Sequence, residues 1–101
     1  MKIQQALDTS SGWYEQFFVE LYPYVFDCLV DGSYGWCRFT DHDYGDFREN
    51  PEVAGLITWL KEQKGRFFME QAGQGDIQTP FTLFIENPDT AVLCKLTWAN
   101  V

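Results

Sequence analysis

The sequence lacks the features that insert a chain into a membrane, export it or bind phosphate. It has no run close to the about 20 apolar residues of a membrane-spanning helix. Residues 1–10 contain one lysine and no apolar run of the kind that signal peptides have. No Lys-Ser or Lys-Thr pair follows Gly73 and Gly75, which excludes a phosphate-binding loop there. We therefore expect a cytoplasmic protein that does not act at a membrane.

Cysteine and basic side chains are scarce. Cys28, Cys37 and Cys94 are odd in number and widely spaced in apolar segments, which predicts buried thiols in a reducing compartment and fits no zinc-binding pattern. Seven lysines and arginines stand against 15 acids, so the net charge is −8. This excess disfavours nucleic acid and anionic membranes as direct partners, because both are polyanions. It favours a basic protein surface, although acidity also keeps an aromatic-rich domain soluble.

Apolar and aromatic residues, by contrast, are abundant. Of the 101 residues, 46% are apolar and 18% are aromatic, which is enough to build a core without disulfides. The length predicts a single domain over residues 1–101. Large rings also anchor binding surfaces, so aromatic side chains outside the core are candidates for contact with a partner.

Two segments have the spacing of amphipathic helices. An aromatic or aliphatic residue at every fourth position predicts a helix over residues 12–22. Asn50 and Pro51 supply an N-cap and a first residue for a second helix over residues 51–64. The apolar face of that second helix consists of Val53, Leu56, Ile57 and Leu60.

The remaining apolar segments have the composition of strands. We predict strands over residues 24–30, 34–40, 66–71, 81–86 and 91–98. The first two are expected to form a hairpin at Asp31-Gly32, and the last two a hairpin at Asn87-Pro88. Alternation along the first strand puts Tyr24, Phe26, Cys28 and Val30 on one face and Val25, Asp27, Leu29 and Asp31 on the other.

The order of these elements, α-β-β-α-β-β-β, predicts the fold class. Segregated runs of strands favour an α+β domain rather than a parallel βαβ arrangement. We expect an antiparallel sheet of about five strands with two helices packed on one face. Residues 1–10 are polar and predict no more than a short helical turn.

Negative charge is concentrated between Asp27 and Glu52, where seven of 26 residues are acids and only Arg38 and Arg48 offset them. Aromatic residues are interleaved with these acids. Carboxylates can pair with lysine and arginine on a partner, while rings supply buried area and cation–π contacts. The rings are also candidates for the core, and the acids for a solvated loop. The predicted partner-binding residues are Asp27, Asp31, Tyr34, Trp36, Asp41, Asp43, Tyr44, Asp46, Phe47 and Glu49.

The same segment partly matches a calcium-binding loop. Asp41, Asp43 and Glu52 fall at its first, third and twelfth positions. However, the glycine required at the sixth position is displaced, because Gly45 is fifth and Asp46 is sixth. We therefore predict no metal site.

Cys37 and His42 form a formal Cys–His pair, which leaves a small thiol enzyme as one alternative. His42 is the only histidine and lies among carboxylates, which would favour its charged form. No motif marks a nucleophile near it, and five residues separate the two side chains across a predicted strand end. The expectation is a protein that is not an enzyme and has no cofactor.

In size, negative charge, aromatic content and lack of an export signal, the sequence resembles the small acidic immunity proteins of bacterial toxin systems, including contact-dependent growth inhibition. The resemblance implies an inhibitor that neutralises a basic toxin, in many such systems a nuclease, through an acidic surface. It rests on no shared motif and assigns no residue a role. The alternative is a phage anti-defence inhibitor, such as an anti-CRISPR protein or a mimic of nucleic acid. The oligomeric state is not predicted.

Overall fold

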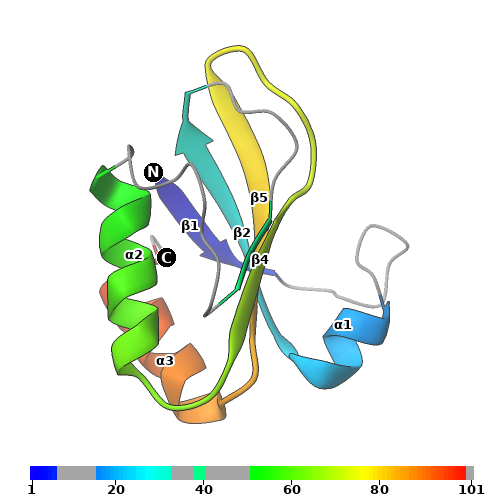
Figure 1. Ribbon diagram of the computed structural model, residues 1–101, viewed down its shortest axis with the longest axis vertical. Helices are drawn as coiled ribbons and strands as arrows, with labels where there is room; N and C mark the ends of the chain where they lie inside the picture. The colour runs from blue at the N-terminus through cyan, green and yellow to red at the C-terminus, as the bar shows by residue number, and fades with distance from the viewer. Residues whose placement is uncertain (7–15, 33–37, 41–50, 100–101) are drawn as a thin grey trace.

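The computed structural model describes residues 1–6, 16–32, 38–40 and 51–99. In chain order the elements are β1 (Lys2–Gln5), α1 (Gln16–Leu21), β2 (Tyr24–Asp31), β3 (Arg38–Thr40), α2 (Pro51–Glu62), β4 (Phe67–Gln71), β5 (Gln78–Ile85) and α3 (Pro88–Thr97). The strands form one antiparallel sheet in the order β1-β2-β5-β4-β3. The predicted α+β class with an antiparallel sheet is therefore confirmed (Figure 1).

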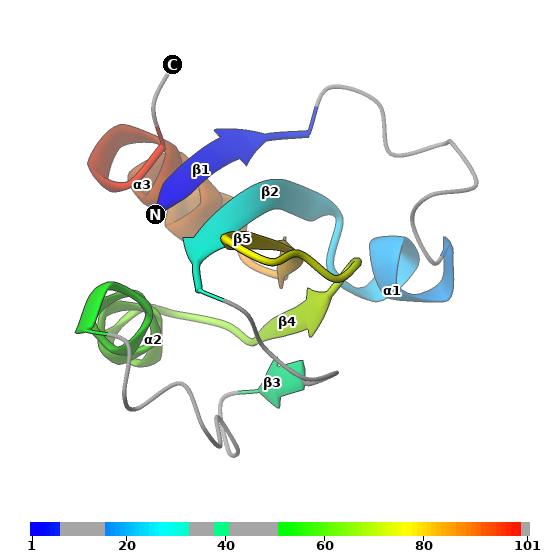
Figure 2. The same cartoon turned by 90° about the horizontal axis from the view of Figure 1, so that it is seen from above.

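Helices α2 and α3 lie side by side on one face of the sheet (Figure 2). Between this helical layer and the sheet lies the main hydrophobic core, because every second residue of β2 and β5 points toward it. Trp59 of α2 and Trp98, the C-cap residue of α3, meet edge to face with their ring centroids 6.3 Å apart. The core contains Ile3, Phe26, Cys28, Val30, Val53, Leu56, Ile57, Leu60, Phe67, Met69, Phe81, Leu83, Ile85, Ala91 and Cys94.

Helix α1 covers one end of the opposite face. Phe18 of α1 stacks on Phe68 with a centroid distance of 4.7 Å and lies 5.9 Å from the ring of Phe84. Val25, Phe68 and Phe84 are buried beneath it. The prediction of both helices on one face is therefore wrong, because the two predicted helices, α1 and α2, pack on opposite sides of the sheet.

The predicted strand over 91–98 is also wrong, since residues 91–97 belong to α3 and Trp98 is its C-cap. The Asn87 side chain accepts hydrogen bonds from the backbone N–H groups of Asp89 at 2.9 Å and Thr90 at 3.2 Å, which is an N-cap. Pro88 follows as a first helical residue that needs no N–H partner. Asn87-Pro88 is thus a helix start and not a hairpin turn.

The predicted hairpin at Asp31-Gly32 does not form between β2 and β3. β2 pairs instead with β5 at eight positions and with β1 at four, while β3 pairs with β4. Gly32 has a φ of 112°, so the chain does turn there, and its N–H bonds the carbonyl of Ile77. This hydrogen bond therefore ties the residue after β2 to the β4–β5 connection, which contains Ile77.

The remaining elements agree with the sequence to different degrees. The helix expected over 51–64 is confirmed as α2, and α1 confirms the part of the 12–22 helix that is described. β4 corresponds closely to the strand expected over 66–71, whereas β5 starts three residues before the strand expected over 81–86. β1 was predicted to be no more than a helical turn, and it forms an edge strand instead.

Candidate functional site

Part of the sheet face that carries α1 has none of the described helices over it. In this part, Asp27, Leu29 and Asp31 of β2 are exposed, whereas Val25 at the other end is buried under α1. Residues that are directly opposite in an antiparallel pair share a face, so the register extends this surface to β1, β5 and β4. We call this surface the open face; it consists of Lys2, Gln4, Asp27, Leu29, Asp31, Glu70, Gln78 and Pro80, and the register places the buried Thr82 and, on β3, Arg38 on the same face.

The open face is ordered in three rows across the strands. Asp31 lies opposite Gln78 in the outermost row. Leu29 lies between its two register partners, Lys2 on β1 and Pro80 on β5. The third row, nearest α1, consists of Gln4, Asp27, the buried Thr82, Glu70 and, on β3, Arg38. The apolar pair Leu29 and Pro80 therefore has a row with a carboxylate on each side of it.

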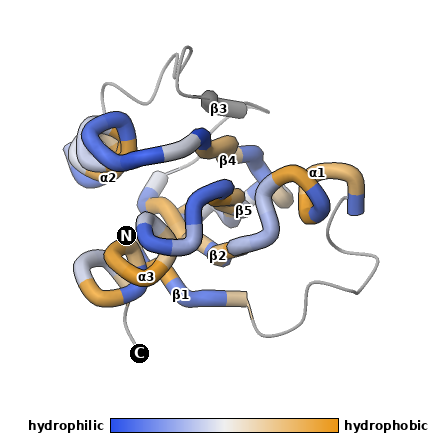
Figure 3. The backbone as a smooth tube through the Cα atoms, turned by 90° about the horizontal axis from the view of Figure 1, so that it is seen from below, coloured by the Kyte–Doolittle hydropathy of each residue, from blue (hydrophilic) through white to orange (hydrophobic). Residues whose placement is uncertain are grey.

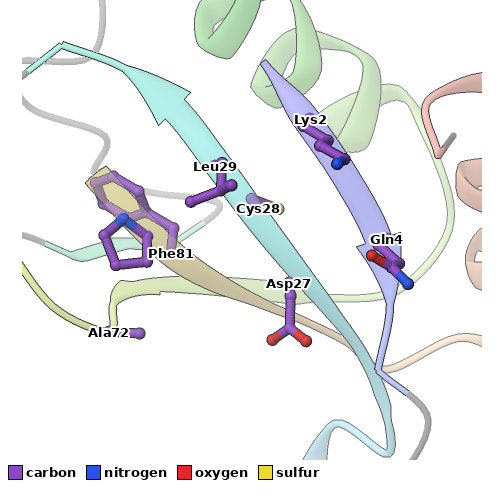
Figure 4. Close-up of a pocket in the computed structure, with 8 residues that line it drawn as sticks. Lys2, Gln4, Asp27, Cys28, Leu29, Ala72 and Phe81 are labelled. Carbon is purple, nitrogen blue, oxygen red and sulfur yellow. The ribbon is translucent and has the colours of Figure 1, made fainter. Parts of the chain in front are cut away.

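A shallow groove of about 220 Å³ crosses the two inner rows (Figure 4). Leu29 is 36% exposed and lies beside Asp27 on the same side of β2. The buried residues Cys28 and Phe81 contribute to the groove wall from the strands behind it, and Ala72 closes it beyond the end of β4. The groove is lined by Lys2, Gln4, Asp27, Cys28, Leu29, Ala72, Pro80 and Phe81.

Asp31 is held by its neighbours on this surface. Its carboxylate accepts a 3.0 Å hydrogen bond from Nε2 of Gln78 and lies 3.5 Å from the α-ammonium group of Met1. The hydrogen bond from Gln78 and the positive charge of Met1 lower the pKa of Asp31. The Met1 ammonium also bonds Glu52 in the first turn of α2, and that bond is the main cause of its raised pKa. This contact links the end of β2 to the start of α2.

Two of the predicted partner-binding residues are described, and both lie on the open face. Asp27 and Asp31 point to the same side of β2, as the alternation of that strand predicted. Glu52, at the far end of the acidic segment, lies next to Met1. The other predicted residues lie outside the described residues, and so do Cys37 and His42; they are Tyr34, Trp36, Asp41, Asp43, Tyr44, Asp46, Phe47 and Glu49.

The described cysteines are core residues. Cys28 and Cys94 are both free thiols buried in the main core. Burial raises the pKa of Cys28, and it raises that of Cys94 to about 12, because a thiolate would lose its solvation there. Neither thiol is therefore a nucleophile. Within the described ranges, no cluster of three or more His, Cys, Asp or Glu side chains is placed to hold a metal ion.

Sequence reasoning missed the residues that β1 and β5 add to the open face. Lys2 and Gln4 flank the buried Ile3, so the polar-apolar-polar alternation of a strand is present, but it is only a few residues long. Gln78 and Pro80 precede the strand that was expected to start at residue 81. Their positions depend on pairing with β2, which lies about 50 residues away in the sequence.

Comparisons of the chain with models of known protein families, with curated proteins and with solved structures found no match. In the part of the chain that the structure describes, no helix has the length and apolar character needed to span a membrane.

Proposed function

We propose that this protein is an inhibitor that binds a basic partner protein, foremost a nuclease toxin, through the open face. The observation that carries the proposal is the juxtaposition of Leu29 and Pro80 with carboxylates, on the part of the sheet that no described helix covers. Interfaces commonly have an apolar centre within a polar rim. Leu29 and Pro80 supply such a centre here, and Asp27 lies directly beside it.

The charge of the rim suits a partner rich in lysine and arginine. Asp27, Asp31 and Glu70 all belong to the open face, which also includes Lys2, the Met1 ammonium beside Asp31 and the register position of Arg38 opposite Glu70. The chain as a whole carries a net charge of −8, which steers a cationic partner toward it and raises the association rate. A nuclease needs a positive cleft for its phosphate substrate, so its surface is complementary to this one.

The sheet also makes the open face rigid before binding. β2 and β5 are paired along their full eight residues, and the core behind them is closed by α2 and α3. A preformed surface loses little conformational entropy on association, which supports tight binding. The predicted acids and rings at 34–49 lie outside the described residues; in the sequence they fall between the end of β2 and the start of α2, so they extend the proposal as a prediction.

The first experiment compares two charge reversals of equal size. Asp27→Lys changes the centre of the open face, whereas Glu62→Lys makes the same change on an exposed residue of α2, on the other side of the sheet. Wild-type protein that is immobilised on a resin and incubated with a lysate of its native host should capture a basic protein. Asp27→Lys should lose that protein and Glu62→Lys should retain it.

The captured partner then provides the quantitative test. Its affinity for wild type should fall as salt is raised, because screening weakens contacts between opposite charges. Asp27→Lys should weaken that affinity about tenfold or more, and a stoichiometric amount of wild type should abolish cleavage of nucleic acid by the partner. Equal effects of the two substitutions would exclude the open face as the interface. A partner whose enzymatic activity is unchanged by saturating wild type would exclude inhibition.

A further inference from the structure

The outer side of α3 presents an apolar surface that the fold does not use. Val92, Leu93 and Leu96 are 58%, 45% and 77% exposed. They are spaced at i, i+1 and i+4, so they lie together on one face of the helix. Figure 3 shows hydrophobic residues along much of α3. Thr90, Ala91 and Cys94 are buried on the inner side of α3, so the stripe formed by Val92, Leu93 and Leu96 faces away from the sheet.

The charges beside the stripe limit what can cover it. Asp89 lies at the N-terminal end of α3 and Lys95 near its C-terminal end, and both are exposed. Among the residues that the structure describes, neither takes part in an ion pair. The stripe is thus close to neutral in a protein with a net charge of −8. A strongly basic partner would gain little electrostatic attraction from this surface. A surface with the same apolar residues and the two charges in the opposite order along its axis would match it.

We propose that this face of α3 packs against the same face of a second copy, with the two helices antiparallel about a two-fold axis near Val92 and Leu93. In this arrangement each apolar stripe covers the other, and Asp89 of each copy comes within reach of the long Lys95 side chain of the other copy. A surface of this kind is self-complementary, as a two-fold interface requires. Antiparallel packing also opposes the two helix dipoles favourably.

The dimer leaves the proposed inhibitory surface free. α3 and the open face lie on opposite sides of the sheet, so the two open faces of a dimer point away from each other. Each dimer can then hold two partner molecules. Because dimerisation uses different residues from partner binding, either proposal can fail while the other stands.

The test measures the mass of the full chain in solution by sedimentation over a range of concentrations. Wild type should approach twice the chain mass of 11.8 kDa as concentration rises. Leu96→Asp should remain a monomer, whereas Ile77→Asp should dimerise like wild type. Ile77 is the matched control, because it is 83% exposed and lies in the β4–β5 connection, away from α3. A monomeric wild type at every concentration, or equal behaviour of the two variants, would overturn the proposal.

A charge exchange tests the antiparallel arrangement itself. Lys95→Glu should weaken the dimer about tenfold, because it replaces two attractive contacts with two repulsive ones. Adding Asp89→Lys to that variant should restore the affinity, since the opposite charges meet again. Thermal unfolding of each variant at a concentration where wild type is monomeric separates loss of the helix from loss of the interface. If the double variant is as weak as Lys95→Glu while its monomer remains folded, the antiparallel pairing is excluded.

Salt distinguishes this interface from the one with the basic partner. Two copies of a chain with a charge of −8 repel each other at long range, and salt screens that repulsion. Dimerisation through the apolar stripe should therefore strengthen as salt is raised. A dimer that dissociates in high salt would show that the Asp89–Lys95 contacts, and not the apolar stripe, supply most of its stability, and this would contradict an apolar interface.

Discussion

The two faces of the sheet differ in how completely they are covered. On one face, α2 and α3 together exclude water from a continuous core that runs from Ile3 on β1 to Met69 on β4. On the other face, the six residues of α1 cover only one end, over Val25, Phe68 and Phe84. The rest of that face carries the carboxylates of Asp27 and Asp31. The same strands therefore supply a stabilising surface on one side and a surface available for binding on the other.

The alternation of β2 shows how the sequence encodes this difference. Phe26, Cys28 and Val30 are each at most 2% exposed on the covered face. Asp27 and Asp31, interleaved with them, are exposed. A charged side chain is costly to bury unless it is paired, so the acids mark the part of the strand that none of the described helices covers. Val25, on the same face as the acids, is apolar because α1 lies over it.

The largest expected effect on stability comes from truncating one leucine on each face of the sheet to alanine. Leu83→Ala on β5 should lower the free energy of unfolding by about 2–5 kcal/mol, because this fully buried leucine would leave a cavity. Leu29→Ala on the neighbouring strand should cost about 1 kcal/mol, because the side chain is already 36% exposed. Urea unfolding followed by Trp fluorescence measures both. Comparable losses would mean that the open face is covered in solution.

The features of this comparison that sequence alone predicted are local ones. α2 was found because its first residue, Pro51, and its apolar spacing are contained within 12 residues. The shared face of Asp27 and Asp31 was found because a strand alternates with a period of two. The assignment of acids to one side of β2 thus needed no knowledge of any other strand.

The features that were missed depend on distant partners or on mixed signals. β1 is four residues long with a single buried residue, Ile3, and it is stabilised by pairing with β2 more than 20 residues later. α3 was taken for a strand because its exposed residues Val92, Leu93 and Leu96 are as apolar as its buried ones. Such a helix has little contrast between its two sides, and contrast is what periodicity detects. The error and the proposed dimer surface therefore have the same origin.

A moderate effect is expected from the residue that starts α3, part of the layer over the covered face. Asn87→Ala removes the side-chain oxygen that accepts from the N–H groups of Asp89 and Thr90. Loss of an N-cap typically costs about 1 kcal/mol. Asn87→Asp keeps an acceptor oxygen and should retain most of the stability, so it serves as the control in the same unfolding measurement. If both variants were equally destabilised, the cap would not be the source of the effect.

The smallest effect expected is a change in the acid dependence of stability on the open face. Gln78 and the Met1 ammonium lower the pKa of Asp31 below its usual value of 3.8, so the unfolded chain binds a proton at this site more readily than the folded protein. The contribution of Asp31 is therefore fully present above pH 3.8 and is lost as pH falls through its lowered folded pKa.

Asp31→Asn should remove that part of the acid dependence. Its stability near neutral pH should fall slightly below wild type, because the asparagine carries no charge for the Met1 ammonium. On acidification the two proteins should converge, since protonated Asp31 has also lost that charge. Thermal unfolding midpoints across the acidic range measure this convergence. A constant offset between wild type and Asp31→Asn at every pH would mean that the carboxylate acts through its shape or hydrogen bonding alone, and that the open face holds Asp31 without using its charge.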